Sequence, residues 1–345
     1  MRVRGSAFIG SLMRYTITAL VALLLVTGCS SGTVITDDGK DIQFRSGDFS
    51  LVGDLHLPEG AGPHPAVVVV HGDGPQTRTS TPGTGTIIER FGDAGFAVFV
   101  WDKPGSGGST GEFSEGKTLS LRAEILADGI QVLVDHPDIN ADRIGLWGIS
   151  QAGWVMPKAL ELTDDVAFMI VVSGGGEDGI EQIAYQLGQN LICGGAPPEQ
   201  GRLVEEHFPP TAKGPDYEDY TEAMEVLVDV DGWENFVGPE FKSEEQWQPW
   251  PSEGDSYFDP MTVIRETTIP VLAVFGEMDR FIDPVQGAEA WGRALASAGN
   301  PDYHVELIPG VGHTMQTQSS MCGSGGSTSD RYLELLDEWI TKLQG

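Results

Sequence analysis

Basic residues are scarce in this 345-residue sequence. Its 20 lysines and arginines stand against 51 aspartates and glutamates, which gives a formal net charge of −31. Nucleic acids and anionic membrane surfaces are bound through clustered basic side chains, so this balance predicts no nucleic-acid partner. We interpret the acidic excess as a strongly solvated surface, because net charge governs solubility rather than fold.

Cysteines and metal-binding patterns are also few. Only Cys193 and Cys322 follow the N-terminal region, and two cysteines are too few for a disulfide framework, although they could pair in an oxidising compartment. The sequence contains no HExxH motif and no cysteine pairs at metal-ligand spacing. Phosphate-binding patterns match by letter at 111–118 and 174–179, but acids stand where the phosphates would lie. We therefore expect neither a metal nor another cofactor.

The first 28 residues have the pattern of an export signal. Three arginines precede an apolar run over residues 17–26, which is shorter than the roughly 20 residues needed to span a bilayer. The following Val26-Thr27-Gly28-Cys29 resembles the lipobox of bacterial lipoproteins. That resemblance implies cleavage after residue 28 and lipidation of Cys29. We expect an exported lipoprotein, anchored in the membrane on the outer side of the bacterial cytoplasmic membrane or in the cell envelope.

After a short polar linker over 29–40, strand-like apolar runs alternate with amphipathic stretches. This alternation is typical of an α/β protein with a mostly parallel sheet. Strands are predicted at 42–45, 51–57, 66–70, 96–101, 143–149, 166–172, 269–275 and 303–308. Helices are predicted near 86–94, 119–135, 154–162, 285–298 and 330–343.

The long segment 174–265 breaks this alternation, because it contains no strand of the core type. A plain connection between a helix and the next strand needs only a few residues, so the excess predicts an insertion. Its aromatic residues argue against a disordered insert. We therefore expect a mainly helical cap, inserted between two parts of the core at 41–173 and 266–345.

The strand predicted at 143–149 runs directly into a serine and then into a helical pattern. This is the context of a nucleophile elbow, where a sharp turn requires small residues two positions before and after the serine. Gly148 fills the first position, and Ala152 stands where the common pattern has glycine. Backbone N–H groups at the start of the helix would face an oxyanion formed at Ser150. Ser150 is therefore the predicted nucleophile, and the N–H of Gln151 is a predicted oxyanion donor.

This order of elements resembles the α/β-hydrolase superfamily, in particular its dienelactone-hydrolase-like esterases and serine aminopeptidase-like proteins. The resemblance covers nearly all of the chain after the signal and implies the α/β-hydrolase fold. In that fold the catalytic residues follow the chain order serine, acid, histidine. The acid is expected after the strand that follows the cap, where Asp279 lies, and the histidine after the last strand, where His313 lies.

Elimination among the remaining candidates favours the same two residues. Only His304 and His313 lie beyond the acid, and His304 falls within a predicted strand, where a buried and satisfied ring is the commoner case. Glu277 and Asp283 compete with Asp279. Asp283 precedes a proline and could instead cap the next helix, so we place Asp279 first and Asp283 second.

The sequence His71-Gly72-Asp73-Gly74-Pro75, after the strand at 66–70, resembles the oxyanion loop of the same family. The backbone N–H of Asp73 is the predicted second oxyanion donor, with that of Gly74 as the alternative. A carboxylate facing the oxyanion would oppose it, so the side chain of Asp73 is expected to point away. We expect His71 to anchor the loop rather than to react.

The glycine-rich loop at 101–109 resembles the family's turn after the fourth strand. We expect Asp102 to accept hydrogen bonds from nearby amides there, and we assign the loop no catalytic role.

These residues predict acyl transfer in two steps. A serine hydroxyl becomes a good nucleophile when a base about 2.6–3.2 Å away takes its proton, and a carboxylate fixes the tautomer of that base. We expect a carboxylesterase that acts on a small-molecule ester. The alternatives are a peptidase or amidase with the same three residues, and a non-catalytic binding lipoprotein that kept the fold.

Overall fold

The computed structural model describes residues 34–35, 41–113, 118–176, 178–213, 216–233, 241–247 and 258–345. The predicted signal peptide, Cys29 and most of the predicted linker lie outside these residues. The described residues all belong to one unit, Gly32–Gly345. No helix among them is both long and apolar enough to cross a membrane.

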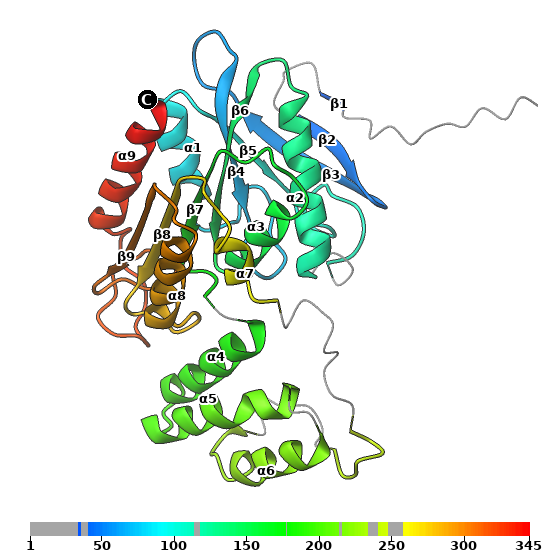
Figure 1. The fold of residues 1–345 in the computed structure, drawn as a ribbon, viewed down its shortest axis with the longest axis vertical. Coiled ribbons are helices and arrows are strands. Elements are labelled where there is room, and N and C mark those ends of the chain that lie inside the picture. Colours follow the sequence, from blue (N-terminus) through cyan, green and yellow to red (C-terminus); the bar gives the residue numbers. More distant parts are fainter. Residues whose placement is uncertain are drawn as a thin grey trace, which may run out of the picture. The chain divides into compact units, whose positions relative to one another are not determined.

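The centre of the molecule is a nine-stranded sheet in the order β1-β2-β3-β5-β4-β6-β7-β8-β9 (Figure 1). The three N-terminal strands pair antiparallel, as do β3 and β5, and all pairs from β5 to β9 are parallel. The strands are β1 Val34–Ile35, β2 Asp41–Ser46, β3 Phe49–His56, β4 His64–Val70, β5 Ala97–Trp101, β6 Ile139–Ile149, β7 Phe168–Val172, β8 Val271–Gly276 and β9 Tyr303–Ile308.

Burial explains which strands the sequence revealed. Strands β5, β7 and β8 are buried at every position, as expected for parallel strands covered on both faces. All eight predicted strands are present. The two-residue strand β1 was not predicted, because its partner β2 decides its pairing and two residues are too few to show a period.

Helices cover both faces of the sheet. Helices α1 and α9 pack on one face, and α2, α3, α7 and α8 pack on the other. The core helices are α1 Thr84–Asp93, α2 Leu119–Val134, α3 Ala152–Leu160, α7 Met261–Ile264, α8 Pro284–Ser297 and α9 Asp330–Gln344. Because the parallel strands end at the same edge of the sheet, the loops that follow them meet there, and this edge is where α/β proteins place their sites.

The segment predicted as a cap contains α4 Gly179–Cys193, α5 Pro198–Lys213 and α6 Tyr217–Leu227. These three helices pack on one another around their own apolar cluster, which includes Ile180 and Tyr220. The side chains of Asp178 and Asp216 accept hydrogen bonds from the first turns of α4 and α6, which fixes where both helices begin. Helix α7 lies within the predicted cap range, but it packs on the core against α3 and α8.

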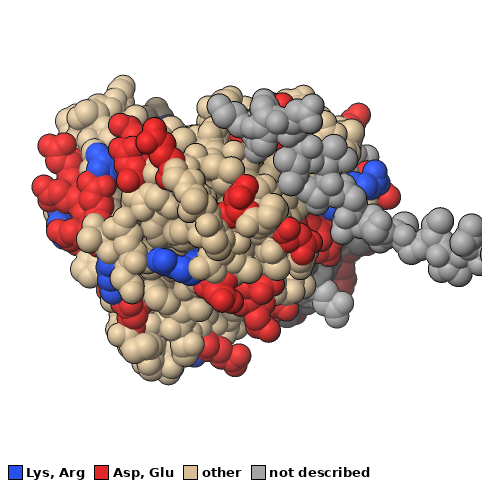
Figure 2. Space-filling model, turned by 90° about the horizontal axis from the view of Figure 1, so that it is seen from above, with Lys and Arg blue, Asp and Glu red and all other residues tan. Residues whose placement is uncertain are grey.

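Acidic side chains outnumber basic ones on the face shown in Figure 2, where they form several separate groups. Some of the basic residues are held in ion pairs, such as those of Lys213 with Asp178 and of Arg331 with Glu306. Exposed pairs of this kind add little stability, so they do not account for the fold.

A disulfide bond joins Cys193, the last residue of α4, to Cys322 in the loop after β9. The two cysteines are 129 positions apart. The sequence left this pairing open, because the proximity of the two residues depends on how the helices of the segment 174–265 meet the loop after β9.

Reduction of this disulfide is expected to lower the free energy of unfolding by about 3–5 kcal/mol, because the bond restricts a long loop of the unfolded chain. The melting temperature should fall by roughly 5–10 °C. Thermal unfolding with and without a reductant measures the change. A double variant, Cys193→Ala with Cys322→Ala, should melt at the lower temperature in both conditions. A thiol count that does not rise on reduction would show that the bond is absent in solution.

Candidate active site

Ser150 lies at the sharp turn between β6 and α3. Its φ of 60° is in the left-handed region, which non-glycine residues rarely adopt and which is typical of strained functional positions. The turn is held by hydrogen bonds from Ser150 N to Val172 O and from Gly153 N to Ser150 O, both 2.9 Å. The strand before the turn and the helix after it therefore fix the serine at the edge of the sheet.

Small residues surround this turn because neighbouring side chains and backbone leave no room for larger ones. A Cβ atom on Gly148 would lie 2.6 Å from the Cβ of Ala152, and one on Gly153 would lie 2.2 Å from the backbone of Gly174. Ala152 itself is fully buried. The expected requirement for small residues on both sides of Ser150 thus has a direct steric cause.

Asp279 and His313 are joined directly. Nδ1 of His313 lies 2.7 Å from Oδ2 of Asp279, whose side chain is 1% exposed. The other carboxylate oxygen of Asp279 accepts hydrogen bonds from the backbone N–H groups of Phe281 (2.8 Å) and Ile282 (3.1 Å). The pairing at Nδ1 leaves Nε2 of His313 as the ring nitrogen available to another group.

The loops that carry this pair are fastened to each other. Glu277 N donates to Ile308 O (3.0 Å) and Met278 N donates to Val311 O (2.8 Å), so the turn after β8 continues the pairing of β8 with β9. A Cβ on Gly276 would lie 2.4 Å from Val311 O. The close approach of the two loops therefore requires glycine at this position.

The rival acids and the rival histidine have other partners. Asp283 caps α8 by accepting hydrogen bonds from Val285 N and Gln286 N, as the sequence suggested. Glu277 accepts a hydrogen bond from Gly310 N at 3.0 Å. The expectation that His304 is buried was wrong, because β9 is the edge strand of the sheet. The His304 side chain is 46% exposed and pairs with Glu306.

The loop after β4 passes directly beside the serine. A Cβ on Gly72 would lie 3.2 Å from the Cβ of Ser150, so a larger residue here would require the serine to shift. His71 is buried and contacts Thr81 Oγ1 through Nδ1 and the carbonyl of Trp101 through Nε2. Burial lowers the pKa of His71 to about 3, so the ring is neutral. Its contacts anchor the loop, as expected.

A cavity of about 670 Å³ opens at this edge of the sheet, and both Ser150 and His313 line it. Asp73 and Gln151, whose backbone N–H groups are the predicted oxyanion donors, line it as well. Asp73 is an exposed residue. Four of the five residues predicted to take part in catalysis therefore surround one space, and Asp279 lies behind His313. Cys29, the predicted lipidation site, lies outside the described residues.

A profile of the alpha/beta hydrolase family matches residues 67–320. The chain belongs to this family. The hydrolase is 24% identical to esterase EstD from Thermotoga maritima over 301 residues, which is 82% of this chain and 61% of that relative. Its fold is similar to Est1E from Butyrivibrio proteoclasticus with bound ferulic acid (TM-score 0.53, 18% identity, 87% and 96% of the two chains). It is also similar to proline iminopeptidase from Mycobacterium smegmatis (TM-score 0.54, 14% identity, 88% and 98%).

Helix α4 of the hydrolase forms one wall of the cavity. Gly179, Gln182, Ile183 and Gln186 share one face of this helix and line the space. Two hydrogen bonds tie the same helix to the turn of the acid: Gln182 Nε2 donates to Phe281 O (2.6 Å), and Tyr185 Oη donates to Asp279 O (2.7 Å). The sequence predicted a cap over this segment, but it did not indicate which face of α4 meets the core.

Two buried basic residues behind the loop after β4 were not predicted from the sequence. Lys103 and Arg122 are 4% and 6% exposed. Lys103 Nζ donates to Gly72 O and Gly74 O, and Arg122 donates to His71 O and to Gln151 Oε1. The available signal was a cation on the apolar face of a helix, since Arg122 lies three residues after Leu119 and four before Leu126, both buried in the core.

Proposed function

We propose that this hydrolase cleaves carboxylic esters through an acyl-enzyme on Ser150. The observation that carries the proposal is the pairing of His313 with Asp279 beside the cavity that Ser150 lines in a strained left-handed conformation. A buried carboxylate fixes the imidazole with its proton on Nδ1, so that Nε2 can accept the proton of the serine hydroxyl. This arrangement makes an otherwise weak nucleophile reactive.

In the first step Ser150 Oγ attacks the ester carbonyl carbon while His313 Nε2 takes the hydroxyl proton. The backbone N–H groups of Gln151 and Asp73 stabilise the oxyanion, His313 returns the proton to the departing alcohol, and the acyl group stays on Ser150. In the second step His313 takes a proton from water, the resulting hydroxide attacks the acyl carbon, and the proton returns to Ser150 as the acid leaves.

The lining of the cavity favours uncharged substrates with an apolar part. Apolar side chains such as Leu119, Trp154 and Ile183 alternate with the neutral amides of Gln76, Gln182 and Gln186. Among the described residues that line the cavity, Asp73 is the carboxylate, and there is no lysine or arginine. These described residues would therefore offer an anionic substrate no opposite charge.

The named relatives support esters without fixing the substrate, since EstD is named an esterase and Est1E was solved with ferulic acid. Their likeness is compatible with the dienelactone-hydrolase-like branch that the sequence resembles.

The test is hydrolysis of aryl esters of increasing acyl length beside aminoacyl amides. We expect the esters to be cleaved, with kcat/KM highest for uncharged acyl groups. Faster cleavage of the amides would assign a peptidase. Cleavage of neither esters nor amides, together with no labelling by a fluorophosphonate probe, would assign a binding protein.

We also propose that the hydrolase is exported and held in the membrane through lipid on Cys29. Disulfides persist in oxidising compartments outside the cytoplasm, so the Cys193–Cys322 bond supports export. The full-length protein expressed in a bacterium should fractionate with membranes, and Cys29→Ala should not. Equal membrane association of the two proteins would rule out the anchor.

A further inference from the structure

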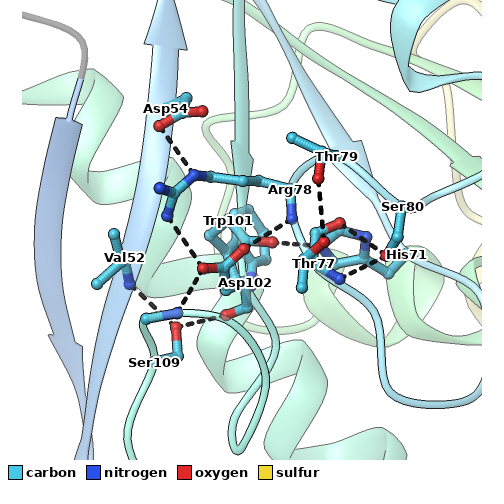
Figure 3. A network of polar contacts seen from close by, with 11 residues as sticks. Val52, Asp54, His71, Thr77, Arg78, Thr79, Ser80, Trp101, Asp102 and Ser109 are labelled. Carbon is cyan, nitrogen blue, oxygen red and sulfur yellow. Dashed lines mark hydrogen bonds and ion pairs between the residues drawn. The ribbon is translucent and has the colours of Figure 1, made fainter.

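The end of β5 makes several contacts with the loop that carries the proposed oxyanion donor. Figure 3 shows Asp102 facing Arg78, which lies between Asp102 and Asp54 with 3.0 Å contacts to each. Asp102 also accepts hydrogen bonds from the backbone N–H groups of Arg78 and Gly108, both 2.8 Å. This confirms the expectation that Asp102 binds nearby amides, and it fastens the loop after β4 to the loop after β5.

Lys103, the next residue, reaches the part of the loop beside the serine. Its Nζ donates to Gly72 O at 2.5 Å and to Gly74 O at 2.8 Å, and its backbone N donates to Gln76 O at 3.0 Å. A peptide group is planar and trans, so its C=O and N–H point in opposite directions. When Lys103 holds the carbonyl of Gly72, the N–H of Asp73 in the same peptide group faces away from the lysine.

Arg122 joins the two segments that supply the proposed donors. One of its terminal nitrogens donates to the carbonyl of His71 in the loop after β4, and the other donates to the side chain of Gln151 at the start of α3. The guanidinium presents its donors in a rigid plane, so both segments are held at a fixed separation.

Burying these two basic side chains is costly, and the charge of Asp73 offsets the cost only in part. Among the described residues, neither Lys103 nor Arg122 forms an ion pair with a carboxylate. Burial, with a smaller effect of the Arg122 charge, lowers the pKa of Lys103 to about 6, and burial lowers the pKa of Arg122 to about 10. The negative charge of Asp73 opposes both shifts. An apolar side chain would fill either position without this penalty.

We propose that Lys103 and Arg122 are positioning residues of the oxyanion hole. Lys103 holds the peptide group between Gly72 and Asp73, and Arg122 holds the same loop and the start of α3, so that the backbone N–H groups of Asp73 and Gln151 face the oxyanion. A hydrogen bond donated to the Gly72 carbonyl also polarises that peptide group, which strengthens the Asp73 N–H as a donor. This inference rests on the proposed function, and it assigns a role to the loop after β5 that the motif alone did not suggest.

The test compares Lys103→Met, which keeps the length of the side chain and removes its donors, with the wild type. Loss of one oxyanion donor costs about 10²–10³-fold in rate, so partial misplacement of one should lower kcat by about 10–100-fold, with KM changed less than threefold. Arg122→Met should behave similarly. Lys158→Met is the matched control, since Lys158 lies on α3 with its Nζ 4.5 Å from the ring centre of Phe258, and its kcat should be unchanged.

A second measurement separates positioning from general damage. Sulfur accepts hydrogen bonds weakly, so an oxyanion hole favours an ester over the matching thionoester. We expect Lys103→Met to reduce this preference several-fold, and Lys103→Gln, which retains an N–H donor, to keep more of it. An unchanged preference, or an unchanged kcat, would overturn the inference. If Lys103→Met does not fold, Lys103→Gln and Arg122→Met can be compared with the wild type in the same way. Failure of the wild type to hydrolyse any ester would instead count against the proposed function.

Discussion

Replacement of Ser150 by alanine is expected to lower kcat for ester hydrolysis by about 10⁴–10⁶-fold, because the variant has no hydroxyl to form the acyl-enzyme. The remaining rate would come from substrate binding and the oxyanion donors, which act without the nucleophile. Labelling by a fluorophosphonate probe should disappear at the same time. Steady-state kinetics and gel fluorescence measure both effects.

The fold of the Ser150→Ala variant should be intact. Alanine meets the same backbone strain at a φ of 60° as serine, so the free energy of unfolding should change by less than about 1 kcal/mol. Ser173→Ala is the matched control. Ser173 also has a positive φ, of 48°, and is fully buried, and its hydroxyl has no hydrogen-bond partner among the described residues. This control should keep its activity and its labelling. A Ser150→Ala protein that retained a tenth of the wild-type rate would place the nucleophile elsewhere.

Asp279→Asn should lower kcat by about 10⁴-fold, although the two side chains have almost the same shape. The reason lies in the partners of the carboxylate. Oδ1 accepts from the N–H groups of Phe281 and Ile282, so the oxygen of asparagine must stay there and its NH₂ group must face His313. The imidazole then has to accept at Nδ1 and carry its proton on Nε2. In that tautomer it cannot take the proton of Ser150.

Asp283→Asn is the control for this change, because asparagine caps helices as well as aspartate does and Asp283 caps α8. Its kcat and melting temperature should stay close to those of the wild type. Because Asp279 is buried and hydrogen-bonded, thermal unfolding should accompany the kinetics. A fall of less than tenfold for Asp279→Asn, together with a large fall for Asp283→Asn, would transfer the role of the acid to Asp283.

The sequence was sufficient for features with a local cause. Fully apolar runs such as Val67–Val70 identify buried strands, because both of their faces are covered. The turn at Ser150 was predictable because its steric requirements fall on residues within three positions of the serine. The order of the acid and histidine came from the resemblance to a known family, and the structure pairs the same two residues.

Features that depend on contacts between distant segments could not be read in this way. The burial expected for His304 failed because a strand pattern does not tell an edge strand from a central one. Arg122 gave only the signal of a cation on an apolar helix face, and Lys103 gave none. Three of their partners are backbone carbonyls of another loop, and every residue has a carbonyl. The face of α4 that lines the cavity depends on where that helix packs.

The disulfide also decides how the chain would carry a mechanical load. It closes a covalent ring from Cys193 to Cys322 that contains Asp279 and His313 and leaves Ser150 outside. Tension between the two chain ends would pass through the sulfur atoms, and the ring would bear none of it directly. A protein pulled from an N-terminal tether would thus carry the load through the segment that holds Ser150, while its acid and histidine remain within a closed loop.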